Sequence, residues 1–385
     1  MNLSTAPEAS SFPLKKIAVW YPGFMGGGAE AVALWMLEAL KGKYDLTLFT
    51  VAEIDFTRLN SMYGTQLSPE FVKLKCLSPK ALEPTVSFAV ANNKNARKLS
   101  FHWLIRYLKE RVHNYDLAIS AYNAIDLGCP GMQYIHWVNV VEGRSFYQKI
   151  SDFSRDRLKQ NISLANSEFV AQRVKRDYQI ESTIVYPPVL LSPIEIPWEQ
   201  KEDVFICSGR LTKPKEPHKV IEILRQVRQQ GFNIKLYLTG GGGGAYAVGY
   251  RRFLQKIIDR NSEWITVYEN LKYKDYVGVI SRCKYGIHYK KEPFGISIAE
   301  MVKAGAIPFV RNIGGQVEIV GEENQELFFE NVDSAVEKIV RVLKDSALEE
   351  ELRRRLSDRN SLFSAERFMS EVKQAVDAYF EAQPN

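Results

Sequence analysis

The segment YKKEPFGISIAEMVKAGAIPFV, residues 289–310, decides the fold, because it holds a loop, a helix and a strand in immediate succession. Aromatic and β-branched side chains just before it predict a short strand. Pro293 and Gly295 then mark a loop, and the spacing of apolar residues after them is helical. The prediction is a strand, a loop, a helix and a strand over residues 285–289, 290–295, 296–303 and 306–310.

Two glutamates stand on either side of the predicted loop–helix junction. Glu292 lies in the loop and Glu300 in the first turns of the helix. Both follow the C-terminal end of a strand, which is where open α/β sheets bind ligands. The N-terminus of the helix offers amide donors to an anion. An alternative interpretation is a capping box, in which Glu300 reaches back toward Ser297 and the start of the helix.

The alternation of strands and helices extends through the whole chain. In the first block we predict strands at residues 15–21, 45–50, 117–120, 132–136, 162–166 and 183–186, with a helix at 29–41. In the second block we predict strands at residues 204–209, 234–240, 264–268, 285–289 and 306–310. The stretch between the blocks, residues 187–203, holds four prolines and no periodic face, which is typical of a linker. This pattern predicts an α/β chain with two Rossmann-like parallel-sheet domains facing a central cleft.

The domain boundaries follow from these blocks. We place the first domain at residues 1–190 and a linker at 191–203. The second domain is placed at 204–363. A last helix within residues 364–385 is able to pack back on the first domain.

Composition limits the function classes. The chain has 385 residues and a net charge of +6, which suits anionic substrates or a membrane surface and is too small to indicate nucleic-acid binding. Neither a signal peptide nor an apolar run of membrane-spanning length is visible, so we expect a cytoplasmic protein. The widely spaced cysteines predict neither a zinc site nor a disulfide framework; they are Cys76, Cys129, Cys207 and Cys283.

A glycine turn follows the first strand and opens the first helix. Gly27 and Gly28 let a ligand approach the backbone there, and a helix N-terminus favours an anion. The spacing differs from the dinucleotide fingerprint GxGxxG, and no acid closes the next strand. The alternative is a tight strand–helix turn without a ligand.

Two cations and a histidine follow other strand ends. Arg210 and Lys215 come after the strand at 204–209 and are able to grip two phosphates, unless they are simply a solvated charge pair. His136 ends the strand at 132–136 and lies either at the mouth of the sheet or in a structural role. His288 sits earlier within its strand, so we expect it to pack in the interior.

These groups match the order of parts in a nucleotide-sugar. Glu300 is placed to accept hydrogen bonds from ribose hydroxyls, and Glu292 from the hydroxyls of a second sugar. The helix amides and the two cations lie between them and suit a diphosphate.

The segments SGRLTKPK (208–215), ANSEFVA (165–171) and the opening stretch together resemble glycosyltransferase family four, which has the GT-B fold. The resemblance runs from the glycine turn to NIGGQVEIV (312–320). It implies a retaining, metal-independent hexosyltransferase without a cofactor. Such an enzyme moves a hexosyl group from a nucleoside-diphosphate sugar to a hydroxyl of a glycan or lipid-linked acceptor. Alternatives are a non-catalytic nucleotide-sugar-binding protein, or an epimerase or hydrolase of the same fold.

The resemblance also implies that the first domain, 1–190, lies on the acceptor side and that the second, 204–363, binds the nucleotide-sugar. It further implies roles for individual residues. Arg210 and Lys215 would hold the diphosphate, Glu300 the ribose and Glu292 the donor sugar. His136 would lie by the reactive face of the sugar. The implied donor site further includes Gly27, Gly28, Leu271, Phe294, Gly295, Ile296 and Ser297.

Two segments, GIHYKKEPFGIS (286–297) and VYPPV (185–189), are similar to the branch that mannosylates dolichol-linked oligosaccharides. This similarity implies GDP-mannose as the donor, with a UDP-sugar as the alternative. That branch normally carries a membrane anchor, and we expect none here, because no apolar run of spanning length is visible in the sequence. The five-glycine run at 240–244 also exceeds the short glycine turn that is usual in the family.

A basic segment at residues 95–116 has helical spacing, with Trp103 among its apolar residues. Such a helix is able to lie on an anionic membrane, which would place the enzyme peripherally on the inner membrane face. The alternative is an ordinary amphipathic helix with its apolar side in the core.

Overall fold

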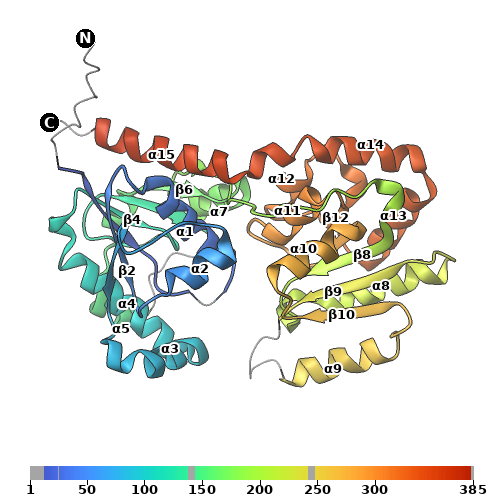
Figure 1. The fold of residues 1–385 in the computed structure, drawn as a ribbon, viewed down its shortest axis with the longest axis horizontal. Helices are drawn as coiled ribbons and strands as arrows, with labels where there is room; N and C mark the ends of the chain where they lie inside the picture. The colour runs from blue at the N-terminus through green and yellow to red at the C-terminus, as the bar shows by residue number, and fades with distance from the viewer. Residues whose placement is uncertain (1–12, 25, 138–143, 242–247, 383–385) are drawn as a thin grey trace, which may run out of the picture.

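The structure is a computed structural model, which describes residues 13–24, 26–137, 144–241 and 248–382. Two α/β domains lie next to each other, each a sheet flanked by helices (Figure 1). All strand pairs in both sheets are parallel. The predicted fold class, an α/β chain with two Rossmann-like domains, is therefore confirmed.

The first domain contains a seven-stranded sheet in the order β3-β2-β1-β4-β5-β6-β7. The order reverses direction between β1 and β4, which is the switch point of a doubly wound sheet. Its strands are β1 Lys16–Trp20, β2 Asp45–Thr50, β3 Val72–Cys76, β4 Leu117–Ser120, β5 Met132–Ile135, β6 Ile162–Ala165 and β7 Thr183–Ile184. Its helices are α1 Gly28–Leu40, α2 Phe56–Tyr63, α3 Glu83–Asn92, α4 Lys94–Lys109, α5 Ser145–Ser151, α6 Arg155–Lys159 and α7 Glu168–Tyr178.

The second domain contains a six-stranded sheet in the order β10-β9-β8-β11-β12-β13. Its switch point lies between β8 and β11, beside the segment at residues 289–310. Its strands are β8 Glu202–Ser208, β9 Lys235–Gly240, β10 Ile265–Glu269, β11 Cys283–His288, β12 Ile307–Arg311 and β13 Phe328–Phe329. Its helices are α8 Pro217–Gln229, α9 Val248–Asp259, α10 Tyr273–Arg282, α11 Ile296–Lys303, α12 Gln316–Val320, α13 Val332–Lys344 and α14 Ser346–Ser357.

Each predicted strand is present to within two residues at either end, and the structure adds β3 and β13. β3 is an edge strand with two lysines, and β13 has only two residues, so neither has a strong strand pattern. β8 begins at Glu202, which pairs with Cys283, so the second sheet starts inside the segment predicted as a linker.

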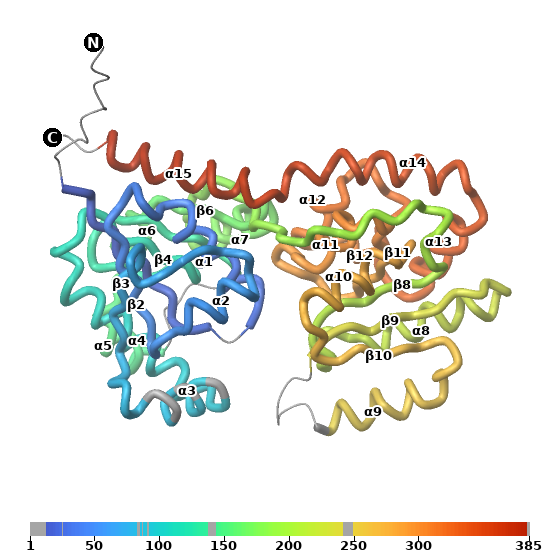
Figure 2. Tube along the Cα trace, viewed as in Figure 1, coloured from blue at the N-terminus to red at the C-terminus, as the bar shows by residue number. Residues whose placement is uncertain are grey.

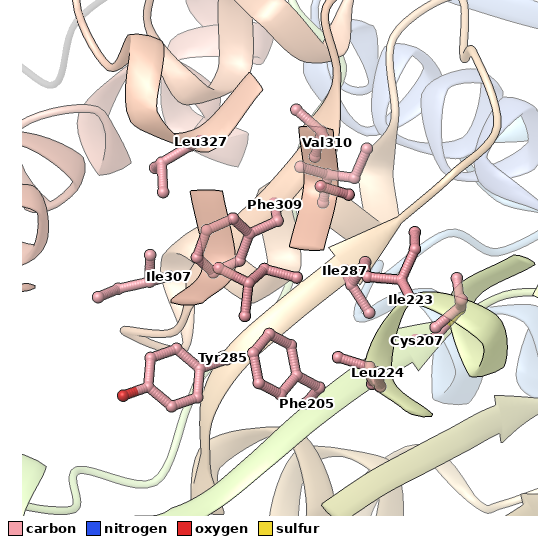
Figure 3. Packing of buried hydrophobic residues seen from close by; sticks show 14 of the residues in the cluster. Phe205, Cys207, Ile223, Leu224, Tyr285, Ile287, Ile307, Phe309, Val310 and Leu327 are labelled. Carbon is pink, nitrogen blue, oxygen red and sulfur yellow. The ribbon is translucent and has the colours of Figure 1, made fainter. Parts of the chain in front are cut away.

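The core of the second domain is aromatic at the centre of its sheet. The rings of Phe205 on β8 and Tyr285 on β11 are stacked with centroids 4.8 Å apart, and Phe309 on β12 lies beside Phe205 (Figure 3). Ile223 and Leu224 of α8 close this layer from one side. This packing fixes the strand ends that carry the candidate site.

The last helix, α15 Ala365–Glu381, runs back along the first domain (Figure 2). Its residues Phe368, Val372 and Val376 are spaced four apart, which puts them on one stripe of the helix. They belong to the same buried cluster as residues of β1 and α1. The chain therefore crosses between the domains twice, and Val189 N on the first crossing donates to Phe363 O on the second over 2.9 Å.

The basic segment at 95–116 is mostly α4, and α4 buries its apolar side. Phe101, Leu104 and Leu108 lie in a core cluster of the first domain. Lys109 is half-buried with a side chain that is 8% exposed, and its Nζ lies 2.6 Å from Asp126 Oδ2. Most of this helix thus has the ordinary amphipathic role, although Trp103 is 52% exposed. Among the described residues no helix is both long and apolar enough to cross a membrane.

We predict that Phe368→Ala lowers the free energy of unfolding by about 3–5 kcal/mol, because the ring of Phe368 is 1% exposed within the core that joins α15 to the first domain. Phe88→Ala is the matched control, because Phe88 is 71% exposed and its truncation should change stability by less than about 0.5 kcal/mol. Urea unfolding followed by circular dichroism measures both variants. Equal midpoints for the two variants would show that α15 does not contribute to the stability of the first domain.

Candidate active site

The loop between β11 and α11 carries Glu292, a carboxylate that is 9% exposed. Lys215 Nζ lies 2.5 Å and His288 Nε2 lies 3.0 Å from its Oε1 atom. Lys290 Nζ lies 3.9 Å from Oε2. Burial alone would raise the pKa of Glu292, but the hydrogen bond from His288 and the charge of Lys215 outweigh it and lower the pKa to about 2. Glu292 is therefore ionised at neutral pH, and His288 donates to it through Nε2.

The backbone around Glu292 is held from α12. The N–H of Glu292 donates to Oε1 of Gln316 over 2.8 Å, and Gln316 is fully buried. The N–H of Gly315 donates to the carbonyl of Glu292 over 3.0 Å. A Cβ on Gly315 would lie 2.2 Å from the carbonyl oxygen of Pro293, so only glycine allows this approach. The Glu292 loop is therefore held in two ways. Lys215 and His288 bond the Glu292 side chain, and residues of α12 and the turn before it bond its backbone.

Glu300 lies in the second turn of α11 and points toward α10. The hydroxyl of Tyr276 donates to its Oε2 over 2.8 Å and lies 3.2 Å from Ser208 Oγ. Burial raises the pKa of Glu300 to about 7, although the hydrogen bond from Tyr276 opposes the rise. The capping box suggested by the sequence is wrong. The N-cap is Gly295 and no side chain caps it, so Ser297 already lies inside the helix.

The two cations differ in their environment. Lys215 ends a short 3₁₀ turn, Lys213–Lys215, after β8 and is bonded to Glu292. Arg210 is exposed just after the end of β8. Gly209 and Gly240, at the ends of the paired strands β8 and β9, have positive φ angles of 138° and 154°. A Cβ on Gly240 would lie 2.0 Å from the carbonyl oxygen of Gly209, so this close approach of the strand ends requires glycine.

The glycine turn of the first domain meets the second domain. A Cβ on Gly28 would lie 2.2 Å from Cδ1 of Ile296, the first residue of α11. The N-termini of α1 and α11 therefore lie against each other. Within the turn, the N–H of Gly26 donates to Glu30 Oε1, and the hydroxyl of Tyr63 donates to Glu30 Oε2 over 2.8 Å. The N–H of Gly27 donates to the Tyr63 hydroxyl over 3.3 Å, so the protein itself engages these amides.

His136 follows β5 and is 5% exposed. Its Nε2 lies 3.0 Å from the carbonyl oxygen of Ala121 and donates to it. Burial lowers the pKa of His136 to about 4, so the ring is neutral at physiological pH. Its ring is tilted against those of Tyr134 and Trp137. The histidine is thus held as one tautomer within an aromatic cluster at the C-terminal end of the inner strand β5.

Two other predicted site residues have apolar surroundings. The ring of Phe294 is 2% exposed and packs against Tyr186 and Phe363, so any contact with a donor would use its backbone. Leu271 packs against the core cluster that contains Met301. Of the five-glycine run, residues 242–244 lie outside the described residues.

Several polar residues at the site were missed by the sequence analysis. His288 is buried as predicted, but it also bonds Glu292, and its spacing of four residues from Glu292 was the available signal. No sequence pattern indicated the other three residues. Gln316 and Tyr276 each bond a residue of a different segment, and Glu30 bonds a backbone N–H within the glycine turn.

Comparisons with known proteins agree with this architecture. Residues 192–361 match the family model described as glycosyl transferases group 1. No curated protein matches the chain. Among solved structures, Anabaena HepE in complex with UDP is 15% identical, with a TM-score of 0.71 over 95% of this chain and 100% of that one. HepE in complex with UDP-glucose is also 15% identical and has a TM-score of 0.67 over 94% and 99% of the two chains.

A glycosyltransferase from Rickettsia africae is 16% identical, with a TM-score of 0.67 over 97% of this chain and 100% of that one. At these identities the likeness shows a shared fold. The chain therefore has the two-domain GT-B fold, and the match to the glycosyl transferases group 1 model lies in its second domain.

Proposed function

We propose that this chain is a retaining glycosyltransferase. It moves a hexosyl group from a nucleoside-diphosphate sugar to a hydroxyl of a glycan or lipid-linked acceptor, without a bound metal. The observation that carries the proposal is the buried, ionised Glu292 bonded to Lys215 at the N-terminus of α11, with Glu300 one turn further along the same helix. The proposal is supported by the match to the glycosyl transferases group 1 model, which includes these residues.

The donor fits this arrangement part by part. Glu300 accepts hydrogen bonds from ribose hydroxyls, and the amides at the start of α11 receive the diphosphate. Glu292 holds the hydroxyls of the transferred sugar. Because HepE shares the fold and has been seen with UDP and with UDP-glucose, a UDP-sugar is the first donor to test, with GDP-mannose as the second.

The proposed chemistry is electrostatic. The bond between the anomeric carbon and the diphosphate breaks, and negative charge grows on the leaving phosphate. Arg210, Lys215 and the amides of α11 stabilise that charge where it develops. The acceptor hydroxyl forms the new bond from the same face, and its proton passes to a phosphate oxygen, so no protein nucleophile is needed. Lys215 must then turn from Glu292 toward the phosphate when the donor binds.

We predict that Lys215→Ala slows sugar transfer by about 100-fold or more, because it removes a charge that stabilises the leaving diphosphate. Lys213→Ala is the matched control, since Lys213 is exposed in the same turn and should keep wild-type activity. Transfer is measured with purified protein, a panel of UDP- and GDP-sugars and a glycan acceptor mixture, with and without EDTA.

Wild-type turnover in Lys215→Ala would contradict the proposed site, and loss of activity in EDTA would contradict a metal-independent reaction. Donor consumption without an acceptor would indicate a hydrolase or an epimerase. Saturable binding with no turnover under any condition would indicate a non-catalytic nucleotide-sugar-binding protein.

We predict that nucleotide-sugar affinity falls as the pH is lowered. The pKa of Glu300 is about 7 in the free protein, so its carboxyl is largely neutral at pH 6 and ionised at pH 8. Only the ionised form accepts hydroxyl hydrogen bonds on both oxygens, so binding expels a proton and should be about tenfold weaker at pH 6 than at pH 8. Calorimetric titration measures this ratio. Glu300→Gln should bind weakly with a flat profile, and an equally flat wild-type profile would exclude Glu300 as the titrating group.

We further propose that helices α3, α4 and α5 contact an anionic membrane. Phe88, Trp103 and Phe146 on these helices are 71%, 52% and 64% exposed, and Lys94 and Lys98 on α4 are exposed as well. The three helices are neighbours in the first domain, because α4 contacts both α3 and α5. This placement suits a lipid-linked acceptor.

We predict that Phe88→Ala combined with Trp103→Ala weakens binding to phosphatidylglycerol vesicles by about tenfold or more at low salt, because both side chains lose apolar area that the lipid would bury. Ile194→Ala is the control, since Ile194 is 54% exposed but lies against the second domain, where its N–H donates to Ser281 Oγ. Co-sedimentation measures the three proteins. No binding by the wild-type chain would count against the membrane proposal and leave the donor site unaffected.

A further inference from the structure

The short helix α12 has polar contacts in two directions. Gln316, its first residue, holds the backbone N–H of Glu292 within the second domain. Glu318, two residues later, reaches the first domain. Residues two apart on an α-helix differ by about 200° around its axis, so the two side chains leave α12 on nearly opposite sides.

Glu318 binds the N-terminus of α7 in the first domain. Its Oε2 accepts from the N–H of Glu168 over 2.7 Å, and its Oε1 accepts from the N–H of Phe169 over 2.9 Å. The hydroxyl of Tyr186 also donates to Oε2 over 3.2 Å. The first amides of a helix have no partner inside the helix and carry partial positive charge, so a carboxylate is well suited to them. Figure 1 shows α7 and α12 side by side where the domains meet.

The same end of α7 makes a second contact, with the loop that carries Glu292. Ser167 is fully buried, and its hydroxyl donates to the carbonyl of Pro293 over 2.6 Å. The Ser167 hydroxyl also accepts from the N–H of Val170 over 3.1 Å, so it caps α7 at the same time. One helix end of the first domain is thus bonded to α12 and to the residue that follows Glu292.

Taking a carboxylate out of water is unfavourable unless hydrogen bonds replace those of water. At the Glu318 carboxylate, hydrogen bonds from two backbone amides and one hydroxyl replace those of water. All three donors lie outside the sheet and helices of the second domain. If the first domain moved away, Glu318 would lose its two amide partners, and Pro293 would lose Ser167 at the same moment. The position of the Glu292 loop is therefore linked to the docking of the two domains.

We propose that Glu318 is a positioning residue that makes the placement of Glu292 depend on the docked arrangement of the domains. The inference rests on the proposed role of Glu292 in holding the transferred sugar. If Glu318 acts in this way, Glu292 binds the transferred sugar in the position needed for transfer only when the first domain, on the acceptor side, is docked against the second. Such gating limits loss of the donor to water.

Glu318→Gln tests the proposal, because the amide keeps the size of the side chain but has one acceptor oxygen for two backbone N–H groups. We expect kcat for transfer to fall about tenfold or more, since a hydrogen bond to a charged group is lost. The Kd for the donor nucleotide should stay within about threefold, because ribose and diphosphate are held by other residues. Hydrogen exchange should become faster in residues 289–296 and 167–171 and remain as in the wild type in β1 and β8.

Two variants serve as controls. Glu322→Gln changes an exposed glutamate just after α12 and should behave as the wild type in both measurements. Glu318→Asp keeps the carboxylate on a shorter side chain and should restore part of the lost kcat.

Wild-type kcat and wild-type exchange at residues 289–296 in Glu318→Gln would overturn the proposal. Faster exchange throughout both domains would also overturn it, because Glu318 would then only stabilise the fold. If the wild-type chain transfers no sugar, the proposed function fails, and the local exchange result alone decides whether Glu318 positions the Glu292 loop.

Discussion

The charge on Glu292 is the constraint on which the rest of the site depends. A carboxylate that is 9% exposed stays ionised only if partners replace the water that it has lost. Those partners come from separate elements: Lys215 from the turn after β8, His288 from β11, and Gln316 from α12 for the backbone. Removing one partner would leave a buried charge poorly compensated, which is costly. The turn, the strand end and the short helix are therefore held in one arrangement.

The second constraint is the approach of two helix N-termini from different domains. α1 begins at Gly28, and a side chain there would collide with Ile296 at the start of α11. Both helix ends carry partial positive charge, so bringing them together without an anion is unfavourable. In the free protein Glu30 supplies negative charge at the end of α1. The proposed donor diphosphate would supply more, which gives a physical reason for the domains to close around it.

Much of the fold was predictable, because its strands and helices are encoded by local patterns. Apolar runs bounded by glycine and proline marked the strands of both sheets, and the proline-rich stretch that begins at residue 187 separated them, although the second sheet begins at Glu202, before the predicted end of that stretch. The pair Glu292 and Glu300 could be placed at a strand–helix junction for the same reason. The weak edge strands β3 and β13 escaped prediction, since their pairing depends on neighbouring strands more than on their own residues.

The protonation state and the partners of the site residues depend on contacts between segments far apart in the chain. Glu292 and Glu300 are the same residue type on neighbouring elements, yet their pKa values shift to about 2 and about 7. Lys215 lies beside the first, whereas the second accepts a hydrogen bond from a tyrosine hydroxyl. Residue order establishes which chemical groups follow which strand, because that information is local. Burial and long-range pairing decide which of them are charged and which are linked across the domains, because desolvation and Coulomb energies depend on distance in space.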